Sequence, residues 1–596
     1  MSHGRAISHD LIPDNILGYK EHDDFVLGMT NLVNTLMIMK YLPPEIMCGR
    51  LLCFNKDPSQ IPTLDNIRPI NIQSVVLKII ESLAFSELQN FIHNRRLLHV
   101  SQAGFRPHRS TAMNLISLAG AMMDIREEGS REGHVLFIDL KAAFDSVSHD
   151  ILFQKLQNLG LREDIINLIK LIYSFAFTKL SHDSFPIPVN RGVLQGSLIS
   201  PYLFNIYIND LLTDLAANDI NALAYADDIA CVCASSEQME EALRTINRWC
   251  SENLIDLNTR KSGYFRIMKK RPSASSSMPA FHGIPFTKTY KYLGVHISNS
   301  GDLIEHIERL LDRIKHQALF WLRLQRNHIS MKTRIELWQT FFRSFILYGM
   351  EIAPLHKTSW DRLERVYFAT LRQAAKVHSR TSCARVLLAS DQWSPEVLVL
   401  YRLLRLEDKY KRHFGKDFPS ALATWMNTTC ASKNLDLEHL RSLNRTNLVK
   451  ELTKRSRKQI LSALGLNKDV EISGDKSILL KTGDLDDNFV VKFYCDNSGN
   501  LIHYKKDHQR TIGSCPSCGS PGNQRHFAND CTIFDKERNE LKKFMSVDFT
   551  TFDTYEFLMY YPFLKDACKD TLSVIKKFIN HICTHTFSYV LALNEQ

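Results

Sequence analysis

The chain has 596 residues, of which 44% are hydrophobic and 23% are charged, and its formal net charge is +10. Thirteen cysteines in this length are too sparse for a secreted disulfide scaffold. The N-terminus lacks the apolar core of a signal peptide, and no apolar run reaches the roughly 18–20 residues of a membrane span. We therefore expect an intracellular protein of three or four domains, without a membrane partner, whose basic excess fits a polyanion.

Two cations stand near the ends of a loop in the N-terminal part of the chain. Residues 1–50 show helical spacing after a short lead, and two short extended segments that follow carry Lys56 and Arg68. Cations held in this way can clamp a triphosphate. A pair of ordinary surface cations is the simpler explanation of this feature taken alone.

A basic loop and a buried strand come next. Gly104-Phe105-Arg106, with Arg109, precedes a predicted helix, and phosphates suit such a position. Residues 134–138 form an apolar run that predicts a buried strand, and Asp139 stands directly at its end. A carboxylate in that setting is costly unless a cation or a partner neutralises it.

The chain is organised around Tyr225-Ala226-Asp227-Asp228. Apolar residues lead up to the acidic pair and follow it, which predicts a β-hairpin with buried strands and two carboxylates at its tip. Adjacent strands of one sheet would bring Asp139 and Asp227 together, and magnesium takes one or two such carboxylates together with phosphate oxygens. A solvated Asp-Asp turn is the alternative for this stretch alone.

From about Ile304 to Arg412 the apolar residues follow a helical period. Basic residues and two tryptophans stand among these helices, at Arg309, Arg313, Lys315, Arg323, Arg326, Lys332, Arg334, Trp321 and Trp338. Exposed aromatic and basic side chains could grip the phosphates of a duplex; a solvated helical bundle is the alternative. The region 416–510 offers only one basic cluster, Lys454, Arg455, Arg457 and Lys458.

The last motif has the spacing C-x2-C-x7-H-x4-C and consists of Cys515, Cys518, His526 and Cys531. Three thiolates and one imidazole at this spacing predict a tetrahedral zinc site, which one small loop can wrap. Zinc binding would then fold the segment.

In their order and spacing, these motifs resemble the reverse transcriptase of non-LTR (LINE-type) retrotransposons of the jockey-like or related clades. The matching run covers roughly residues 5–300 and continues more loosely to about 415, and the Cys/His motif resembles one near the C-terminus of these elements. The resemblance implies an α+β right-hand polymerase with fingers, a palm built on an antiparallel sheet, a helical thumb, and a C-terminal extension with a small CCHC zinc segment.

The resemblance also implies roles for the palm residues. Asp139 and Asp227 would ligate the catalytic magnesium ions, and Asp228 would assist through its charge and hydrogen bonds. Phe144 stands where the family keeps an aromatic that excludes a ribose 2′-OH. Lys261, in the segment after Leu257-Asn258, is a candidate general acid for the leaving pyrophosphate.

Further residues are implied to bind substrates. Arg68 and Lys56 would contact the triphosphate, while Gln195 and Gly196 of the turn Arg191–Ser197 would line the incoming dNTP and template. The segment around Arg106 and Arg109 resembles a template-contacting motif. The primer-gripping hairpin would comprise Tyr292, Leu293 and Gly294.

The expected regions follow from these assignments. They are fingers at 1–135, a palm with the catalytic aspartates and the primer-grip hairpin at 136–300, a helical thumb-like region at 301–415, an extension without an assigned role at 416–510, the CCHC zinc segment at 511–535 and a helical tail at 536–596.

The implied function is an RNA-directed DNA polymerase that extends a primer 3′-OH with dNTPs by a two-metal mechanism. Its cofactors would be two Mg²⁺ ions, with Mn²⁺ as a substitute, and Zn²⁺. Its partners would be an RNA template, a DNA or RNA primer, and a separate endonuclease, because no endonuclease motif is evident. The resemblance favours the nucleus, with the cytoplasm as the alternative.

Two rival functions remain at this point. One is another enzyme of the same fold, such as a group II intron maturase, a telomerase-like protein or a domesticated polymerase. The other is a non-catalytic or domesticated nucleic-acid-binding protein that retains the polymerase scaffold. Metal-dependent primer extension discriminates between catalysis and binding alone.

Overall fold

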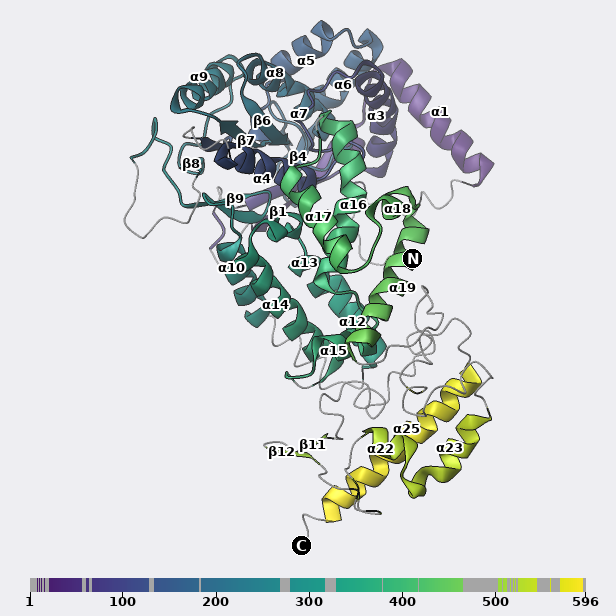
Figure 1. Ribbon diagram of the computed structural model, residues 1–596. Helices are drawn as coiled ribbons and strands as arrows, with labels where there is room; N and C mark the ends of the chain where they lie inside the picture. Colours follow the sequence, from purple (N-terminus) through teal and green to yellow (C-terminus); the bar gives the residue numbers. More distant parts are fainter. Residues whose placement is uncertain are drawn as a thin grey trace. The chain divides into compact units, whose positions relative to one another are not determined.

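The protein is represented by a computed structural model, which divides into two compact units (Figure 1). The first unit comprises 1–301 and 409–416, and the second comprises 302–408 and 417–596. The structure describes, apart from isolated positions, residues 21–55, 61–63, 67–127, 133–181, 184–267, 279–316, 329–377, 379–415, 417–464, 502–505, 508–511, 524–543 and 569–592.

The first unit contains a four-stranded sheet in the order β6-β7-β3-β8, in which every neighbouring pair is antiparallel. β3 is buried at every position, because both faces of the sheet are covered, which explains its apolar run from Val135 to Ile138. The antiparallel sheet expected for the palm is therefore present. Its strands are β3 (His134–Ile138), β6 (Asn221–Tyr225), β7 (Asp228–Cys233) and β8 (Gly263–Arg266).

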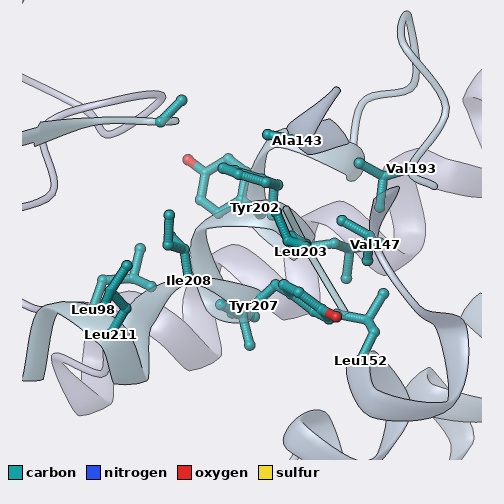
Figure 2. Close-up of a cluster of buried hydrophobic side chains, with 14 of the residues drawn as sticks. Leu98, Ala143, Val147, Leu152, Val193, Tyr202, Leu203, Tyr207, Ile208 and Leu211 are labelled. Carbon is teal, nitrogen blue, oxygen red and sulfur yellow. The ribbon is translucent and has the colours of Figure 1, made fainter. Parts of the chain in front are cut away.

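Helices pack on one face of this sheet to form the main core of the unit. Ile138 and Ile229 pair across β3 and β7 and join an apolar cluster that includes Ile246 of α9. Figure 2 shows another part of this cluster, where Leu152, Tyr207 and their neighbours interlock. The helices of the unit are α1 (Asp23–Met39), α2 (Pro44–Met47), α3 (Val75–Arg95), α4 (Thr111–Glu127), α5 (His149–Asn158), α6 (Glu163–Ser174), α7 (Ser200–Tyr207), α8 (Asn209–Ala217) and α9 (Ser236–Glu252), with a 3-10 turn at Ala143–Ser146.

A two-stranded hairpin packs against the other face of the sheet. Phe137 follows Leu136 in β3 and therefore points away from the helical core; its ring stacks on Tyr290 of β9 with centroids 4.2 Å apart. The two-residue turn of the hairpin has positive φ at both Leu293 and Gly294, as a type I′ turn requires. The strands are β9 (Thr289–Tyr292) and β10 (Val295–Ser298).

A second sheet of the first unit joins two strands near the N-terminus to two short strands after α6, in the order β2-β1-β4-β5. β1 pairs antiparallel with β2 and parallel with β4, which pairs antiparallel with β5. The strands are β1 (Cys48–Asn55), β2 (Ile67–Ile72), β4 (Phe177–Lys179) and β5 (Ile187–Pro188).

The second unit begins with helices, as the helical period predicted. The expectation that its tryptophans are exposed is wrong for Trp338, which is fully buried and donates from Nε1 to the hydroxyl of Thr370. Arg334 is also buried and donates from Nε to the carbonyl of Ala374 at 2.9 Å. These two side chains therefore stabilise the helical core. Trp321, Arg323 and Arg326 lie outside the described residues.

Helices make up most of the second unit in the described ranges, and β11 and β12 pair as an antiparallel hairpin. The elements are α10 (Ile304–His316), α12 (Met331–Leu337), a π-helical turn (Trp338–Arg343), α13 (Ser344–Ile346), a 3-10 turn (Met350–Leu355), α14 (Lys357–Ala375), α15 (Cys383–Ser390), α16 (Pro395–Phe414, whose end groups with the first unit), α17 (Ser420–Ser432), α18 (Leu437–Ser442), α19 (Arg445–Ala463), β11 (Ile502–Lys505), β12 (His508–Thr511), α22 (Gln524–Asn529), a 3-10 turn (Thr532–Phe534), α23 (Asp535–Lys542) and α25 (Lys569–Ala592). Among the helices in the described ranges, none combines the length and the apolar character needed to cross a membrane.

Candidate active site

Three aspartates meet at one end of the four-stranded sheet. Asp139 follows β3 directly, and Asp228 opens β7, where the next residue, Ile229, pairs with Ile138. Asp227 occupies the two-residue turn between β6 and β7, in which Ala226 has a positive φ of 57°. The structure thus brings together two acidic motifs that are far apart in sequence.

Burial and the charges of neighbouring carboxylates raise the pKa of Asp227 and Asp228. Burial raises the pKa of Asp227, and the charge of Asp139 adds to this effect, whereas Arg68 opposes it. Burial, Asp227 and Asp139 together raise the pKa of Asp228 to about 6, against the influence of Lys291. Like charges held this close favour protonation or a bound cation. Oxygen ligands and negative charge are what Mg²⁺ requires, so the residues present fit a magnesium site.

Asp139 is held by the segment that follows α9. Asn258 donates from Nδ2 to Oδ2 of Asp139 at 2.8 Å and from its main-chain N–H to the Asp139 carbonyl at 2.8 Å. The main-chain N–H of Asp139 donates to Oγ of Ser262 at 3.0 Å. Lys261 lies on the same turn with an exposed side chain, and its carbonyl accepts a hydrogen bond from the Tyr290 hydroxyl at 2.9 Å.

The glycine-rich turn lies beside the end of β2. The main-chain N–H of Asn71 donates to the Gln195 carbonyl at 2.7 Å, and Nε2 of Gln195 donates to Asp145 at 3.0 Å. A Cβ at Gly196 would lie 2.2 Å from the Asn71 carbonyl oxygen, and φ there is 122°, so only glycine fits. β2 also carries Arg68. The hydrogen bond between Asn71 and Gln195 therefore connects the strand of Arg68 with the glycine-rich turn, the two segments predicted to bind substrate.

Phe144 takes part in a cluster of aromatic rings next to the acidic hairpin. Its ring stacks on Phe204 with centroids 4.4 Å apart and meets Phe105 edge-on at 6.3 Å. Phe105 in turn lies 6.4 Å from Tyr225 of β6. Phe144 is half-buried, so one part of the ring is fixed by packing while another part reaches solvent.

The remaining predicted site residues are Lys56 and the three residues of the predicted primer grip. Lys56 lies outside the described residues. Tyr292 is buried, and its hydroxyl donates to the Leu223 carbonyl at 3.1 Å, so this ring supports the sheet. Leu293 is also buried, which leaves Gly294 as the exposed member of the predicted primer grip.

The arginines of the basic loop contact the protein's own main chain. Arg106 donates from one nitrogen to the carbonyls of His99 at 2.8 Å and Gln102 at 3.1 Å, and Arg109 donates to the Gln102 carbonyl at 2.6 Å. Burial lowers the pKa of Arg106 to about 10 and that of Arg109 to about 9. These side chains therefore anchor the loop, and their contact with a template stays a prediction.

The four residues of the C-terminal motif gather as predicted. The ligand atoms of Cys515, Cys518, His526 and Cys531 all lie within 4.8 Å of one another. The sulfurs of Cys515 and Cys531 are 3.6 Å apart, and Sγ of Cys518 lies 3.3 Å from Nε2 of His526. Tetrahedral zinc with Zn–S bonds of about 2.3 Å separates two thiolates by about 3.8 Å, so the set fits zinc.

Two residues that the sequence motifs do not include form hydrogen bonds with the main chain of the segments that carry the site residues. Gln102 bonds the turn that carries Asp227, and Glu81 accepts a hydrogen bond from the Leu198 N–H at 2.9 Å, next to the glycine-rich turn. Both side chains are fully buried. Glu81 is a charged residue on the apolar face of a predicted helix. This is a usable signal in the sequence, because glutamates are rarely buried.

Comparisons with known proteins agree with this geometry. The family model of reverse transcriptase (RNA-dependent DNA polymerase) matches residues 55–297. The RNA-directed DNA polymerase from mobile element jockey of Drosophila funebris is 24% identical, over 55% of this chain and 38% of its own length. The retrovirus-related Pol polyprotein from type-1 retrotransposable element R2 of Popillia japonica is 26% identical, over 59% of this chain and 51% of its own length.

The chain thus spans about half or less of the length of these relatives. Among solved structures, apo telomerase from Candida tropicalis is 13% identical and covers 72% of this chain and 74% of its own, with a TM-score of 0.37, which is too low to support an argument. The resemblance found in the sequence is confirmed by the family match and the relatives. Residues 55–297 thus match the reverse transcriptase family, and this part of the chain is similar to relatives named for mobile element jockey and retrotransposable element R2.

Proposed function

We propose that the chain is an RNA-directed DNA polymerase, which extends the 3′-hydroxyl of a DNA or RNA primer with dNTPs on an RNA template. The observation that carries this proposal is the meeting of Asp139, Asp227 and Asp228 at one end of the sheet, where Arg68 acts on Asp227. Carboxylates that repel one another destabilise a fold, so a structural scaffold gains nothing from them. The names of the relatives describe the same activity for those proteins.

Asp139 and Asp227 would hold magnesium, or manganese in its place, and the raised pKa values of Asp227 and Asp228 support a site that needs a cation. Bound there, the metal would activate the primer hydroxyl and offset negative charge on the leaving pyrophosphate. Asn258 fixes the orientation of the Asp139 carboxylate by its hydrogen bond to Oδ2, which supports a role of this side chain as a metal ligand.

The chain's own side chains would bind and orient the nucleotide. Arg68 would pair with the triphosphate, the Gln195–Gly196 turn would line the base pair, and Phe144 would exclude a 2′-hydroxyl by contact with its ring. When the primer oxygen attacks the α-phosphorus, the bond to the bridging oxygen breaks, and Lys261 would donate a proton to that leaving oxygen. The exposed position of Lys261 on the turn bonded to Asp139 supports this role.

The second unit would supply the remaining functions. The helices after residue 302 would act as a thumb on the primer–template duplex, and the Cys/His set within 511–535 would bind zinc, as its thiolate and imidazole groups favour. The enzyme would act in the nucleus.

Primer extension tests the proposal. The purified chain is given an RNA template, an annealed DNA primer, four dNTPs and Mg²⁺, beside an Asp227→Asn variant and an Asp214→Asn control, since Asp214 is an exposed aspartate on α8 that pairs with Arg248. We expect extension by the wild type and the control but not by Asp227→Asn. No extension by the wild type, with duplex still bound, would favour a non-catalytic nucleic-acid-binding protein.

A further inference from the structure

Gln102 stands in the segment between α3 and α4, and its side chain is fully buried. We propose that Gln102 is a positioning residue of the polymerase, which holds Asp227 in place by bonding the main chain of the neighbouring Ala226. The inference rests on the proposed function, because Asp227 matters here as a metal ligand. Gln102 lies outside the sequence motifs that contain the proposed catalytic residues.

The amide of Gln102 bonds both main-chain groups of Ala226. Its Oε1 accepts hydrogen bonds from the N–H groups of Ala226 and Gly104, each at 2.8 Å, and its Nε2 donates to the Ala226 carbonyl at 3.2 Å. Only an amide provides an acceptor and a donor in this arrangement without adding charge beside the aspartates. Glutamine is therefore matched to the turn in both length and polarity.

The turn needs such support because of its conformation. Ala226 adopts a positive φ of 57°, which is unfavourable for a residue with a Cβ. The hydrogen bonds of Gln102 compensate for this cost and fix the peptide groups on each side of Ala226. Because Asp227 is the next residue, the direction of its side chain depends on these bonds.

Main-chain contacts bring Gln102 to this position. The N–H of Ala103 donates to the Ala224 carbonyl at 2.8 Å, and the N–H of Ala224 donates to the Ser101 carbonyl at 3.0 Å, so the segment runs beside β6 like an added parallel strand. A Cβ at Gly104 would lie 2.4 Å from the Ala226 nitrogen, so glycine permits the close approach.

The arginines of the basic loop complete the arrangement. Arg106 and Arg109 both donate to the carbonyl of Gln102, at 3.1 and 2.6 Å. The glutamine is thus fixed at its main chain by two guanidinium groups and at its side chain by the turn. A buried network in which each partner is satisfied rigidifies its surroundings.

Gln102→Met tests the proposal, since methionine has a similar length but makes none of these bonds. Gln89→Met is the matched control, because Gln89 is a glutamine of α3 with one side-chain bond, to the Tyr202 hydroxyl. For Gln102→Met we expect kcat of primer extension to fall about 10- to 100-fold, as when a partner of a metal ligand is removed. The KM for dNTP and the affinity for duplex should stay at wild-type values, and the control should be unchanged.

A readout other than activity separates positioning from general stability. Added Mg²⁺ should raise the thermal unfolding midpoint of the wild type and of Gln89→Met, and the increase should be smaller for Gln102→Met. Wild-type kcat and an undiminished Mg²⁺ effect in a folded Gln102→Met would overturn the proposal. A wild type that never extends a primer would instead reject the polymerase function itself.

If Gln102→Met does not fold, Gln102→Asn replaces it. Asparagine keeps an uncharged amide that can both donate and accept, but it is one methylene shorter and therefore weakens the bonds to Ala226 without burying a charge. It should fold and show a smaller loss of kcat with unchanged KM. Equal kcat for this variant and the wild type would contradict the positioning role.

Discussion

Asn258 donates a hydrogen bond from Nδ2 to Oδ2 of Asp139 at 2.8 Å, although 119 residues separate the two positions in the chain. Oδ1 of the same Asn258 side chain accepts a bond of 3.3 Å from the N–H of Lys261. One amide group therefore connects a proposed metal ligand with the turn that carries the proposed proton donor. This side chain adds to the hydrogen bonds by which the Asn258 N–H and Ser262 Oγ already join Asp139 to the same turn.

Replacement of Asn258 by alanine should leave the Asp139 carboxylate free to rotate. We expect kcat to fall about 10- to 100-fold and the Mg²⁺ concentration for half-maximal extension to rise, because partners that orient metal ligands have effects of this size. Single-turnover extension across a Mg²⁺ titration measures both quantities. Asn247→Ala, at another position on the first unit, serves as the control; equal Mg²⁺ curves for both variants would contradict this role of Asn258.

Lys261→Ala should slow the chemical step without weakening nucleotide binding. General acids contribute about 10²- to 10⁴-fold to a reaction rate, so the single-turnover rate should fall within this range. The dNTP concentration at half-maximal rate should not change, because the exposed side chain has no role in the ground state. Arg260→Ala removes a neighbouring cation and is the control. A full single-turnover rate for Lys261→Ala would mean that another group protonates the pyrophosphate.

Phe144→Ala should relax discrimination against ribonucleotides. The ring is fixed by its stack on Phe204, so its removal opens space without moving Asp139. We expect the ratio of kcat/KM for dNTP over rNTP to fall about 10-fold or more. Extension with each nucleotide type measures the ratio, and Phe105→Ala, which removes the edge contact at 6.3 Å, serves as a comparison. A ratio unchanged by Phe144→Ala would reject the steric role.

The acidic site was predictable from sequence because its signals are local. Asp139 and Asp227 each stand where an apolar strand ends. If the two strands are neighbours in one sheet, the two aspartates lie at the same edge of that sheet. Gln102 was not predictable, because it acts on Ala226, 124 residues away, through main-chain groups that have no sequence signature. The burial of Trp338 is not predictable for a related reason: helical spacing does not tell which face of a helix becomes the core.

Glu81 is a buried glutamate of α3 whose oxygens accept hydrogen bonds from Leu198 and Gln73. Burial raises its pKa above the ordinary value of 4.5. The Glu81 carboxyl therefore binds its proton more tightly in the folded state than in the unfolded state. The contribution of Glu81 to stability is greatest below pH 4.5 and is lost as pH rises through the raised pKa.

Glu81→Gln should consequently gain stability relative to the wild type as pH rises. Thermal midpoints measured without metal from about pH 4 to about pH 8 should shift in favour of the variant. Glu87→Gln, an exposed glutamate on the same helix, controls for the loss of one carboxylate and should not follow this trend. A difference that is constant with pH, or that favours the wild type at high pH, would contradict the assignment.

The Cys/His set shares a small core with the C-terminal helices. Phe534, which follows the motif, contacts Phe527 of α22 and Phe578 of α25 with ring centroids 6.1 Å apart in each case. Buried Arg538 of α23 donates to the carbonyls of Phe527 and Cys531. The metal site and the helices α22, α23 and α25 should therefore fold together.

Removal of zinc should unfold this core as one unit. Structural zinc contributes about 10–16 kcal/mol of binding free energy in zinc-finger peptides, so Cys518→Ser or a chelator should abolish amide-exchange protection in both α23 and α25. Exchange in β3 and β7 should not change, since their hydrogen bonds lie in the other unit. Cys53→Ser, an exposed cysteine of β1, is the control and should keep one equivalent of zinc. Loss of zinc with α25 still protected would show that the helix folds without the metal site.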